Sequence, residues 1–455
     1  MHRSPCPSLC PRLSLLFLCL LAACGEGSRN ASTAVVPARE GPPAQAVAAP
    51  AATRAAPAEY RQEVAAIDSA IANSMRFIDQ QRDDTLVTLE TGALHVERAR
   101  LTGNYDDYAK AAELLAAATA RSHAASFPCL ALAKIHYALH RLHAATAALE
   151  ACPGSVDPAE IGGLSADIAF YSGRYREAEG IYRDLVNQVG TPRQYIRLAL
   201  LKNRMGSPGE AAALLEAAEA RYHGRSATMK AWLKLQRGLI AWDRGRLDEA
   251  VALYSLAADE LAGWWLVDEH VAEAKRLAGD SAGARTIYES IIRRSGQPEH
   301  MDALAQLLRE SETPEAATEW IKRADAIYRE RLKSFPEASV GHAVDHFLRF
   351  GQPTEALALA RRNVELRPYG DAQIALAAAL FRAGQAGAAA ELIARVEASG
   401  WNTAELHAVA AQINAGLGRH AEADAQRARA VAMNPYAMRL HPLVQPAPSA
   451  GVSVR

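Results

Sequence analysis

Histidines at helical spacing are the first candidates for chemistry in this sequence. Two groups have i, i+4 spacing: His136, His140 and His143, and His342 and His346 with Asp345 beside them. Such spacing can place imidazole and carboxylate groups around a metal ion. Neither group is joined by an HExxH motif or a pair of cysteines. We therefore expect no metal site, and we interpret these histidines as ordinary surface or groove residues.

Sequence motifs for catalysis are absent. The chain has no GxSxG nucleophile turn, no GxxxxGK[ST] phosphate loop and no glycine-rich dinucleotide turn after a strand. The neighbouring carboxylates Asp248 and Glu249 fall at a predicted helix start, where they favour the helix dipole. The chain has 50 lysines and arginines against 51 acidic residues, so it lacks the excess of basic residues that is typical of nucleic-acid-binding proteins. We expect no enzymatic activity, no cofactor and no nucleic-acid partner.

A phrase that starts at a glycine and reaches an alanine five residues later recurs along the chain. Clear copies start at Gly173, Gly206, Gly245, Gly279, Gly351, Gly384 and Gly418, and weaker ones at Gly103, His140 and Ser311. Successive starts are 37, 33, 33, 39, 34, 32, 40, 33 and 34 residues apart. In an alanine-rich chain, a period near 34 indicates stacked helix–turn–helix units. Glycine suits the turn because it tolerates positive φ.

Residues at fixed distances from each turn predict how the helices pack. An alanine stands five residues after the start of most copies, for example Ala178, Ala250 and Ala356. A small residue stands seven residues before most starts. Large residues stand nine after the start: Tyr182, Leu215, Tyr254, Tyr288 and Trp320. Small residues allow two helices to approach closely, and the large ones would fill the space to the next unit.

Position by position, this pattern resembles the tetratricopeptide repeat (TPR), over about residues 86–436. It is clearest in LSADIAFYSGRYREAEGIYRDLV (164–186) and LQRGLIAWDRGRLDEAVALYSLAA (235–258), and Asn434-Pro435 stands where the family places its terminal proline. The resemblance implies an all-α, right-handed superhelical solenoid of about ten helix–turn–helix units. Single units of such a solenoid should not fold alone.

In the TPR family, the first helix of each unit lines a concave groove that binds peptides or proteins. The family's groove positions, carried over from their places before each turn, include Asp167, Tyr171, Arg193, Asn203, Arg204, Trp232, Trp242 and Arg276. Arginine and asparagine could hold a carboxylate or a peptide backbone, and Arg and Trp are frequent at binding hot spots. For Trp232 and Trp242 the alternative is that they pack between units.

The N-terminus resembles that of a bacterial lipoprotein. Arg3 and Arg12 precede an apolar run that is too short to span a membrane, and Leu21-Ala22-Ala23-Cys24 looks like a lipobox. The resemblance implies a signal peptide over 1–23, acylation of Cys24 and, because Gly25 follows, a periplasm-facing position on the outer membrane. The remainder of 24–57 is rich in Ala, Pro, Ser and Gly, which predicts a disordered tether.

The repeat region is expected to carry a cap and a tail. Residues 58–85 contain an amphipathic helix with Ile67 and Ile71 on its apolar face, which we interpret as a capping helix. Residues 437–455 are polar and proline-rich, which predicts a disordered tail.

Two cysteines remain once the signal peptide is removed and Cys24 is acylated. Cys129 and Cys152 lie 11 residues before and 12 after the turn at His140, so an antiparallel hairpin would bring them opposite each other. An oxidising periplasm would permit a disulfide. Two buried thiols acting as small apolar groups are the alternative.

These features predict a non-catalytic scaffold or adaptor that is anchored to the cell envelope and binds protein or peptide partners in its groove. A structural subunit of an envelope or secretion complex is the alternative. An enzyme or metal-binding protein built on His342 and His346, or on the histidines of residues 136–143, is a third hypothesis.

Overall fold

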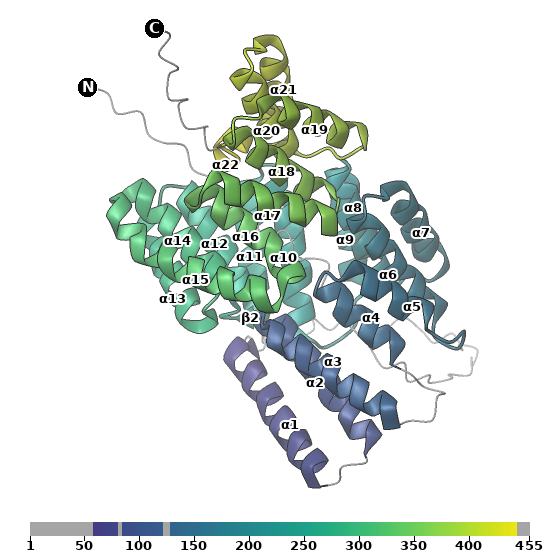
Figure 1. Cartoon of the computed structure of the whole chain (residues 1–455). Helices are drawn as coiled ribbons and strands as arrows, with labels where there is room; N and C mark the ends of the chain where they lie inside the picture. The colour runs from purple at the N-terminus through teal and green to yellow at the C-terminus, as the bar shows by residue number, and fades with distance from the viewer. Residues whose placement is uncertain (1–57, 81–83, 122–127, 444–455) are drawn as a thin grey trace, which may run out of the picture.

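The computed structural model describes residues 58–80, 84–121 and 128–443, and these form an almost wholly helical molecule (Figure 1). The predicted signal peptide, Cys24 and the tether lie outside the described residues. Within them, two short strands, β1 (Ala58–Glu59) and β2 (Leu261–Ala262), pair in parallel. None of the helices in this part of the chain has the length and apolar character needed to cross a bilayer.

Ten helical hairpins, which we call units 1 to 10, follow one another along the chain. In order they are α2 (Thr85–Thr102) with α3 (Tyr105–Arg121), α4 (Cys129–Ala138) with α5 (Leu142–Glu150), α6 (Pro158–Tyr171) with α7 (Tyr175–Gln188), α8 (Pro192–Arg204) with α9 (Pro208–Arg221), α10 (Ala227–Asp243) with α11 (Leu247–Glu260), α12 (Trp265–Leu277) with α13 (Ser281–Ser295), α14 (Pro298–Ser311) with α15 (Thr318–Ser334), α16 (Pro336–Phe350) with α17 (Pro353–Leu366), α18 (Gly370–Arg382) with α19 (Ala386–Ala398), and α20 (Ala404–Gly416) with α21 (His420–Met433). Helix α1 (Tyr60–Gln80) precedes them, the short 3-10 helix η2 (Pro314–Ala317) leads into α15, and α22 (Ala437–Leu440) follows α21. The predicted all-α solenoid of TPR-type hairpins is confirmed.

The turns and the small residues behave as the repeat predicts. Gly173 and Gly245 adopt φ of 76° and 68°, in the left-handed region that glycine enters without steric cost. His140 is the exception, a non-glycine residue with φ of 58°. Ala178 is fully buried, and a Cβ added to Gly238 would lie 2.5 Å from the Tyr254 ring. The spacing of the two helices in a unit is therefore set by residues without bulk.

The superhelix closes on itself after five units. The space beside each turn glycine of units 1, 3, 4 and 5 is filled by the loop that follows the unit five places later: Gly103 by Gln297, Gly173 by Pro368, Gly206 by Asn402, and Gly245 by Pro435. We call this contact between the first turn (units 1–5) and the second turn (units 6–10) the seam. At Gly279, Gly384 and Gly418 of the second turn, no described atom comes within 4 Å of an added Cβ.

Hydrogen bonds along the seam satisfy carbonyl groups at the ends of first helices. Trp265 Nε1 donates to Leu101 O at 3.0 Å, Asn402 N to Arg204 O at 2.9 Å, and Asn434 Nδ2 to Trp242 O at 3.0 Å. The last carbonyls of a helix have no partner within the helix. The second turn therefore caps helices of the first.

An aromatic cluster forms the middle of the seam. Trp401 is 1% exposed, and its ring centroid lies 5.7 Å from that of Phe170, 5.3 Å from that of Tyr175 and 6.2 Å from that of Tyr369. Aromatic pairs at these distances add to the stabilisation from buried area alone. The two turns thus share one hydrophobic core.

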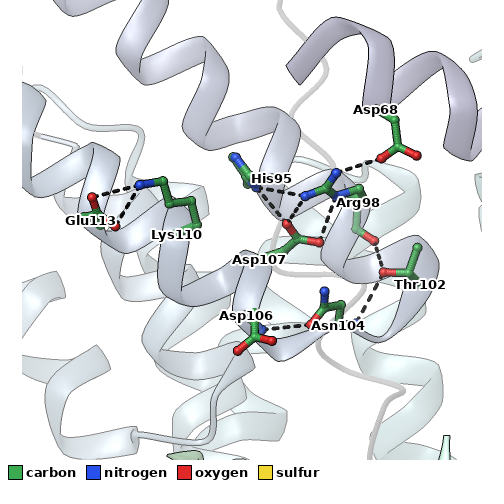
Figure 2. Close-up of polar contacts among 9 residues, drawn as sticks. All are labelled: Asp68, His95, Arg98, Thr102, Asn104, Asp106, Asp107, Lys110 and Glu113. Atoms are coloured by element: carbon green, nitrogen blue, oxygen red, sulfur yellow. Dashed lines mark hydrogen bonds and ion pairs between the residues drawn. The ribbon is translucent and has the colours of Figure 1, made fainter. Parts of the chain in front are cut away.

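Polar contacts secure the N-terminal end of the solenoid (Figure 2). Arg98 on α2 donates to Asp68 on α1 at 2.7 Å and, through Nε, to Asp107 on α3 at 2.9 Å. His95 Nδ1 lies 2.7 Å from the same Asp107 carboxylate. One guanidinium group therefore ties α1 to the first unit, where Ile67 and Ile71 of α1 are buried.

The C-terminal end is closed in two ways. Asp424 and Arg427 are exposed on α21, and Arg427 takes the place that Tyr182 occupies, buried, on α7. A polar outer face is what a terminal repeat requires. The expectation of disorder from residue 437 is wrong for 437–443, because Leu440 and Leu443 are buried and Gln412 bonds the backbone of 441 and 443 at 2.7 Å.

Candidate functional site: the lumen of the superhelix

Polar side chains from both turns meet inside the superhelix. We define the lumen cluster as six partly exposed residues of the first helices: Asn203, Arg204, Asp243, Asp345, Asp371 and Glu405. Arg204 of α8 lies 3.4 Å from the carboxylate of Asp371 on α18, across the seam. Asn203 donates to Asp243 on α10 at 2.8 Å. The cluster therefore sets four carboxyl groups against one guanidinium group.

The carboxylates around Arg204 stabilise its positive charge. Burial by itself would lower the Arg204 pKa, but Asp371, Asp243 and Glu405 outweigh burial and raise it. The guanidinium carbon of Arg204 also lies 6.0 Å from the centre of the Trp401 ring, and the face of an aromatic ring attracts a cation. Arg204 thus links the acidic lumen to the aromatic part of the seam.

Asp345 is the most perturbed member of the cluster. Burial raises its pKa to about 7, with help from Glu405, Asp302 and Asp371 and against the effect of Arg349. The cause is desolvation first and repulsion between carboxylates second. A carboxyl group in this position changes its charge near neutral pH.

Four of the predicted groove residues are not accessible. The exposed fractions are 0% for Asp167, 2% for Tyr171, 1% for Trp232 and 4% for Trp242. Asp167 accepts bonds from Tyr182 at 2.7 Å and from Arg197 at 2.9 Å. The expectation that Trp232 and Trp242 line an open groove is wrong, and the alternative of packing between units describes them. The reason is that neighbouring units and the second turn cover these positions.

The other four predicted groove residues form a partly exposed polar row. Arg193 donates to Glu160 at 2.8 Å and Arg276 to Glu310 at 3.0 Å, with 13% and 10% of the arginine side chains exposed. Asn203 and Arg204 continue this row into the lumen cluster. Three of these pairs join the first helices of consecutive units, and Arg204–Asp371 joins the two turns.

Sequence reasoning missed the acidic side of the lumen. Asp371 and Glu405 stand 13 residues before Gly384 and Gly418, and Asp345 stands six before Gly351, which are groove positions of the family. The predicted groove residues all lie in the third to sixth units. Applied to units 8 to 10, the same rule would have identified all three carboxyl groups.

Three of the five candidate histidines, His140, His342 and His346, are buried, whereas His136 is partly exposed and His143 is exposed. His346 Nδ1 lies 2.8 Å from Asp302 Oδ1, and His342 lies 3.7 Å from Glu299. Burial lowers the pKa of His342, and it lowers that of His140 far below the usual range. In the described ranges, no three His, Cys, Asp or Glu side chains are arranged to hold a metal ion. The expectation of ordinary surface or groove histidines is therefore wrong for His140, His342 and His346, because they contact neighbouring buried helices.

Cys129 and Cys152 are joined by a disulfide in the structure, with Cα atoms 5.3 Å apart. Cys129 starts α4 and Cys152 follows α5, so the bond closes the base of unit 2. Of the two alternatives left open by the sequence, the structure has the disulfide.

Comparison with known proteins does not assign the chain to a family. No family model matches it, and no curated protein matches it. Among solved structures it is similar to a crystal structure of MamA (14% identity, 37% of this chain and 96% of that chain, TM-score 0.31). It is also similar to PilW, described as a widely conserved type IV pilus biogenesis factor (17%, 47% and 96%, 0.37), and to IFIT1 bound to Gppp-AAAA (12%, 80% and 94%, 0.38). At these TM-scores the likenesses carry no functional argument, and function is argued from the chain's own residues.

Proposed function

We propose that this chain is a non-catalytic scaffold of the bacterial cell envelope. In this proposal, lipidated Cys24 anchors it to the periplasmic side of the outer membrane, and the tether of residues 25–57 carries the solenoid. Protein or peptide partners bind the partly exposed polar row of the first helices.

The observation that supports partner binding is the row of polar pairs between consecutive units. Arg193–Glu160, Asn203–Asp243 and Arg276–Glu310 each join neighbouring first helices. A partner's carboxylate can take the place of Glu160 or Glu310 on the arginine, and a partner's backbone carbonyl can take the place of Asp243 on Asn203. A row repeated along the solenoid suits an extended chain better than a compact ligand.

Site-specific photo-cross-linking in living cells tests this surface. A photoreactive amino acid replaces Asn203 on the inner helices and, as a matched control, exposed Ala213 on the outer face of α9. The proposal predicts a discrete adduct from position 203, weakened by Arg193→Ala, and none from position 213. An adduct from 213 alone would place the partner on the outer face. Self-adducts together with oligomers in light scattering would favour the structural-subunit alternative.

Membrane anchoring is tested separately. Cys24→Ala should prevent acylation and move the chain from the membrane pellet to the soluble periplasmic fraction. Retention of the variant in the outer-membrane fraction would refute lipid anchoring through Cys24. Trp242→Ala is unsuitable as a binding test, because Trp242 is only 4% exposed and its loss would disturb the core.

A further inference from the structure

Arg367 is a positive charge buried at the seam without a negative partner. It follows α17, and the residue is 0% exposed. Its Nη2 donates to the neutral amide oxygen of Asn363 at 2.9 Å, whereas Nε and Nη1 have no hydrogen-bond partner among the described residues. No carboxylate in this part of the chain forms a hydrogen bond or an ion pair with Arg367. Arg197, which is equally buried, has the carboxylate of Asp167 at 2.9 Å. Because an isolated ion is far more costly to bury than a paired one, the environment of Arg367 favours an anion.

Two tyrosines from opposite sides of the seam flank the guanidinium group. Its carbon lies 5.8 Å from the centre of the Tyr171 ring, at the end of α6, and 5.6 Å from that of the Tyr369 ring, just before α18. The two ring centroids lie 4.8 Å apart. Aromatic faces attract a cation but carry no net charge. The tyrosines therefore hold Arg367 between the two turns and do not neutralise it.

His140 of unit 2 brings a second unpaired group to the same place. Its ring centroid lies 5.8 Å from that of Tyr171, and its Nδ1 has no hydrogen-bond partner among the described residues. Burial, and then the charge of Arg367, lower the pKa of His140 far below its usual range, so the imidazole is neutral and Nδ1 can carry a hydrogen. His140 also has a left-handed φ of 58° where Gly173 stands in the next unit. Such strain persists where the surroundings hold a residue in place, as they do at ligand sites.

We propose that Arg367 and His140 form a binding site for one small monovalent anion, of which chloride is the fitting example. Arg367 supplies the positive charge, and its unpaired N–H groups and Nδ1–H of His140 donate hydrogen bonds to the anion. His342, whose charge also acts on His140, already faces Glu299 at 3.7 Å and does not belong to the site. The site needs no partner protein, so it goes beyond the proposed function and is tested independently of it.

The surroundings select the size and the charge of the anion. Tyr171, Tyr369 and His140 are only 2%, 3% and 4% exposed, so an anion among them must be small and must give up its water. Chloride gives up its water more readily than phosphate does, and its single charge balances one guanidinium group. Because the two donors come from different turns of the superhelix, the anion binds the closed seam and not the unfolded chain. Chloride should therefore stabilise the folded protein by mass action.

Thermal unfolding of the full chain in detergent tests the site, with gluconate replaced by chloride at constant ionic strength. Once chloride exceeds its dissociation constant, each tenfold increase should lower the unfolding equilibrium constant by about tenfold, and the unfolding temperature should rise. Equal unfolding temperatures in the two salts would mean that water, and not an anion, completes the hydrogen bonds of Arg367. That result would overturn the proposal.

Two variants and a matched control assign the effect to these residues. Arg367→Gln should abolish the chloride dependence, whereas Arg361→Gln, the same change at an exposed position on α17, should keep it. Should Arg367→Gln not fold, His140→Gly remains, because glycine suits this turn in the other units. It removes one donor, so about tenfold more chloride should be needed for the same stabilisation. An unchanged chloride dependence in either variant would contradict the site.

Bromide locates the anion directly. In crystals grown with bromide in place of chloride, an anomalous difference peak should lie within hydrogen-bonding distance of Arg367 Nε or Nη1 and of His140 Nδ1. Diffraction data that show no peak between these two residues would overturn the proposal.

Discussion

A methyl group added at the seam should destabilise the protein more than the same methyl group added at an open turn. Gly245 and Gly384 occupy the same place in their units and adopt similar φ of 68° and 77°. A Cβ on Gly245 would lie 2.6 Å from Pro435 Cδ and 2.8 Å from Asn434 Oδ1, whereas at Gly384 no described atom comes within 4 Å. The pair therefore separates backbone strain from packing at the seam.

The expected magnitudes follow from these two environments. Gly384→Ala carries only the strain of a left-handed alanine, roughly 1–2 kcal/mol. Gly245→Ala carries the same strain plus overpacking against a proline ring and a fully buried asparagine, which costs about 1–3 kcal/mol more. We expect Gly245→Ala to lower the free energy of unfolding by about 2–5 kcal/mol in total.

Urea unfolding of the two variants and the parent chain, followed by circular dichroism under one set of conditions, measures this difference. The unfolding midpoint of Gly245→Ala should lie clearly below that of Gly384→Ala, and the order does not depend on perfect two-state behaviour. Equal midpoints would mean that Pro435 and Asn434 do not pack on the turn of unit 5. The seam would then be absent in solution at that position.

Three further predictions concern buried groups. Asp167→Ala leaves the fully buried Arg197 without its carboxylate and should lower the free energy of unfolding by about 3–5 kcal/mol in thermal or urea unfolding, whereas a loss under 1 kcal/mol would contradict the buried pair. When it is purified from an oxidising compartment, the chain should gain two daltons on reduction of Cys129–Cys152, and no mass change would exclude the disulfide. Reduction should also cost about 3 kcal/mol of stability, because the bond spans 23 residues. Because burial raises the Asp345 pKa from 3.8 to about 7, this carboxyl contributes stability at low pH that is lost as the pH rises through 7. Between pH 4 and pH 8.5 the free energy of unfolding of the parent should therefore fall by up to about 4 kcal/mol relative to that of Asp345→Asn, and parallel pH profiles would contradict the assigned environment.

The repeat could be predicted from the sequence because its determinants are local and periodic. Gly173 needs positive φ and Ala178 needs burial wherever the hairpin stands in the solenoid, so each unit repeats the same signal. The end of the chain shows the opposite case. Leu440 and Leu443 belong to no repeat, and tertiary contacts with the last unit, α20 and α21, give this segment its structure.

The closed lumen could not be predicted in the same way. Whether Trp242 faces an open groove or lies under another turn depends on the number of units in one superhelical turn. That number is set by small differences in helix packing that add up over five units. Asn402 and Asn434 contact residues about 190–200 positions earlier in the chain, and neither belongs to the repeated phrase. A positional rule drawn from single units therefore identified Arg204 but not the residues of the second turn that surround it.

Contact between the two turns is tested most directly by cross-linking across the rim of the seam. Arg141 of unit 2 and Glu337 at the start of unit 8 form a partly exposed ion pair with Nε and Oε2 3.4 Å apart, so cysteines there should leave the core intact. In the chain carrying Arg141→Cys and Glu337→Cys, a short bis-maleimide should join the two positions under native conditions and not in urea. The pair Arg141→Cys and Glu365→Cys, whose second cysteine lies on exposed α17, is the matched control. Efficient cross-linking of the first pair alone is the predicted result, and no native cross-link between positions 141 and 337 would show that the superhelix is open.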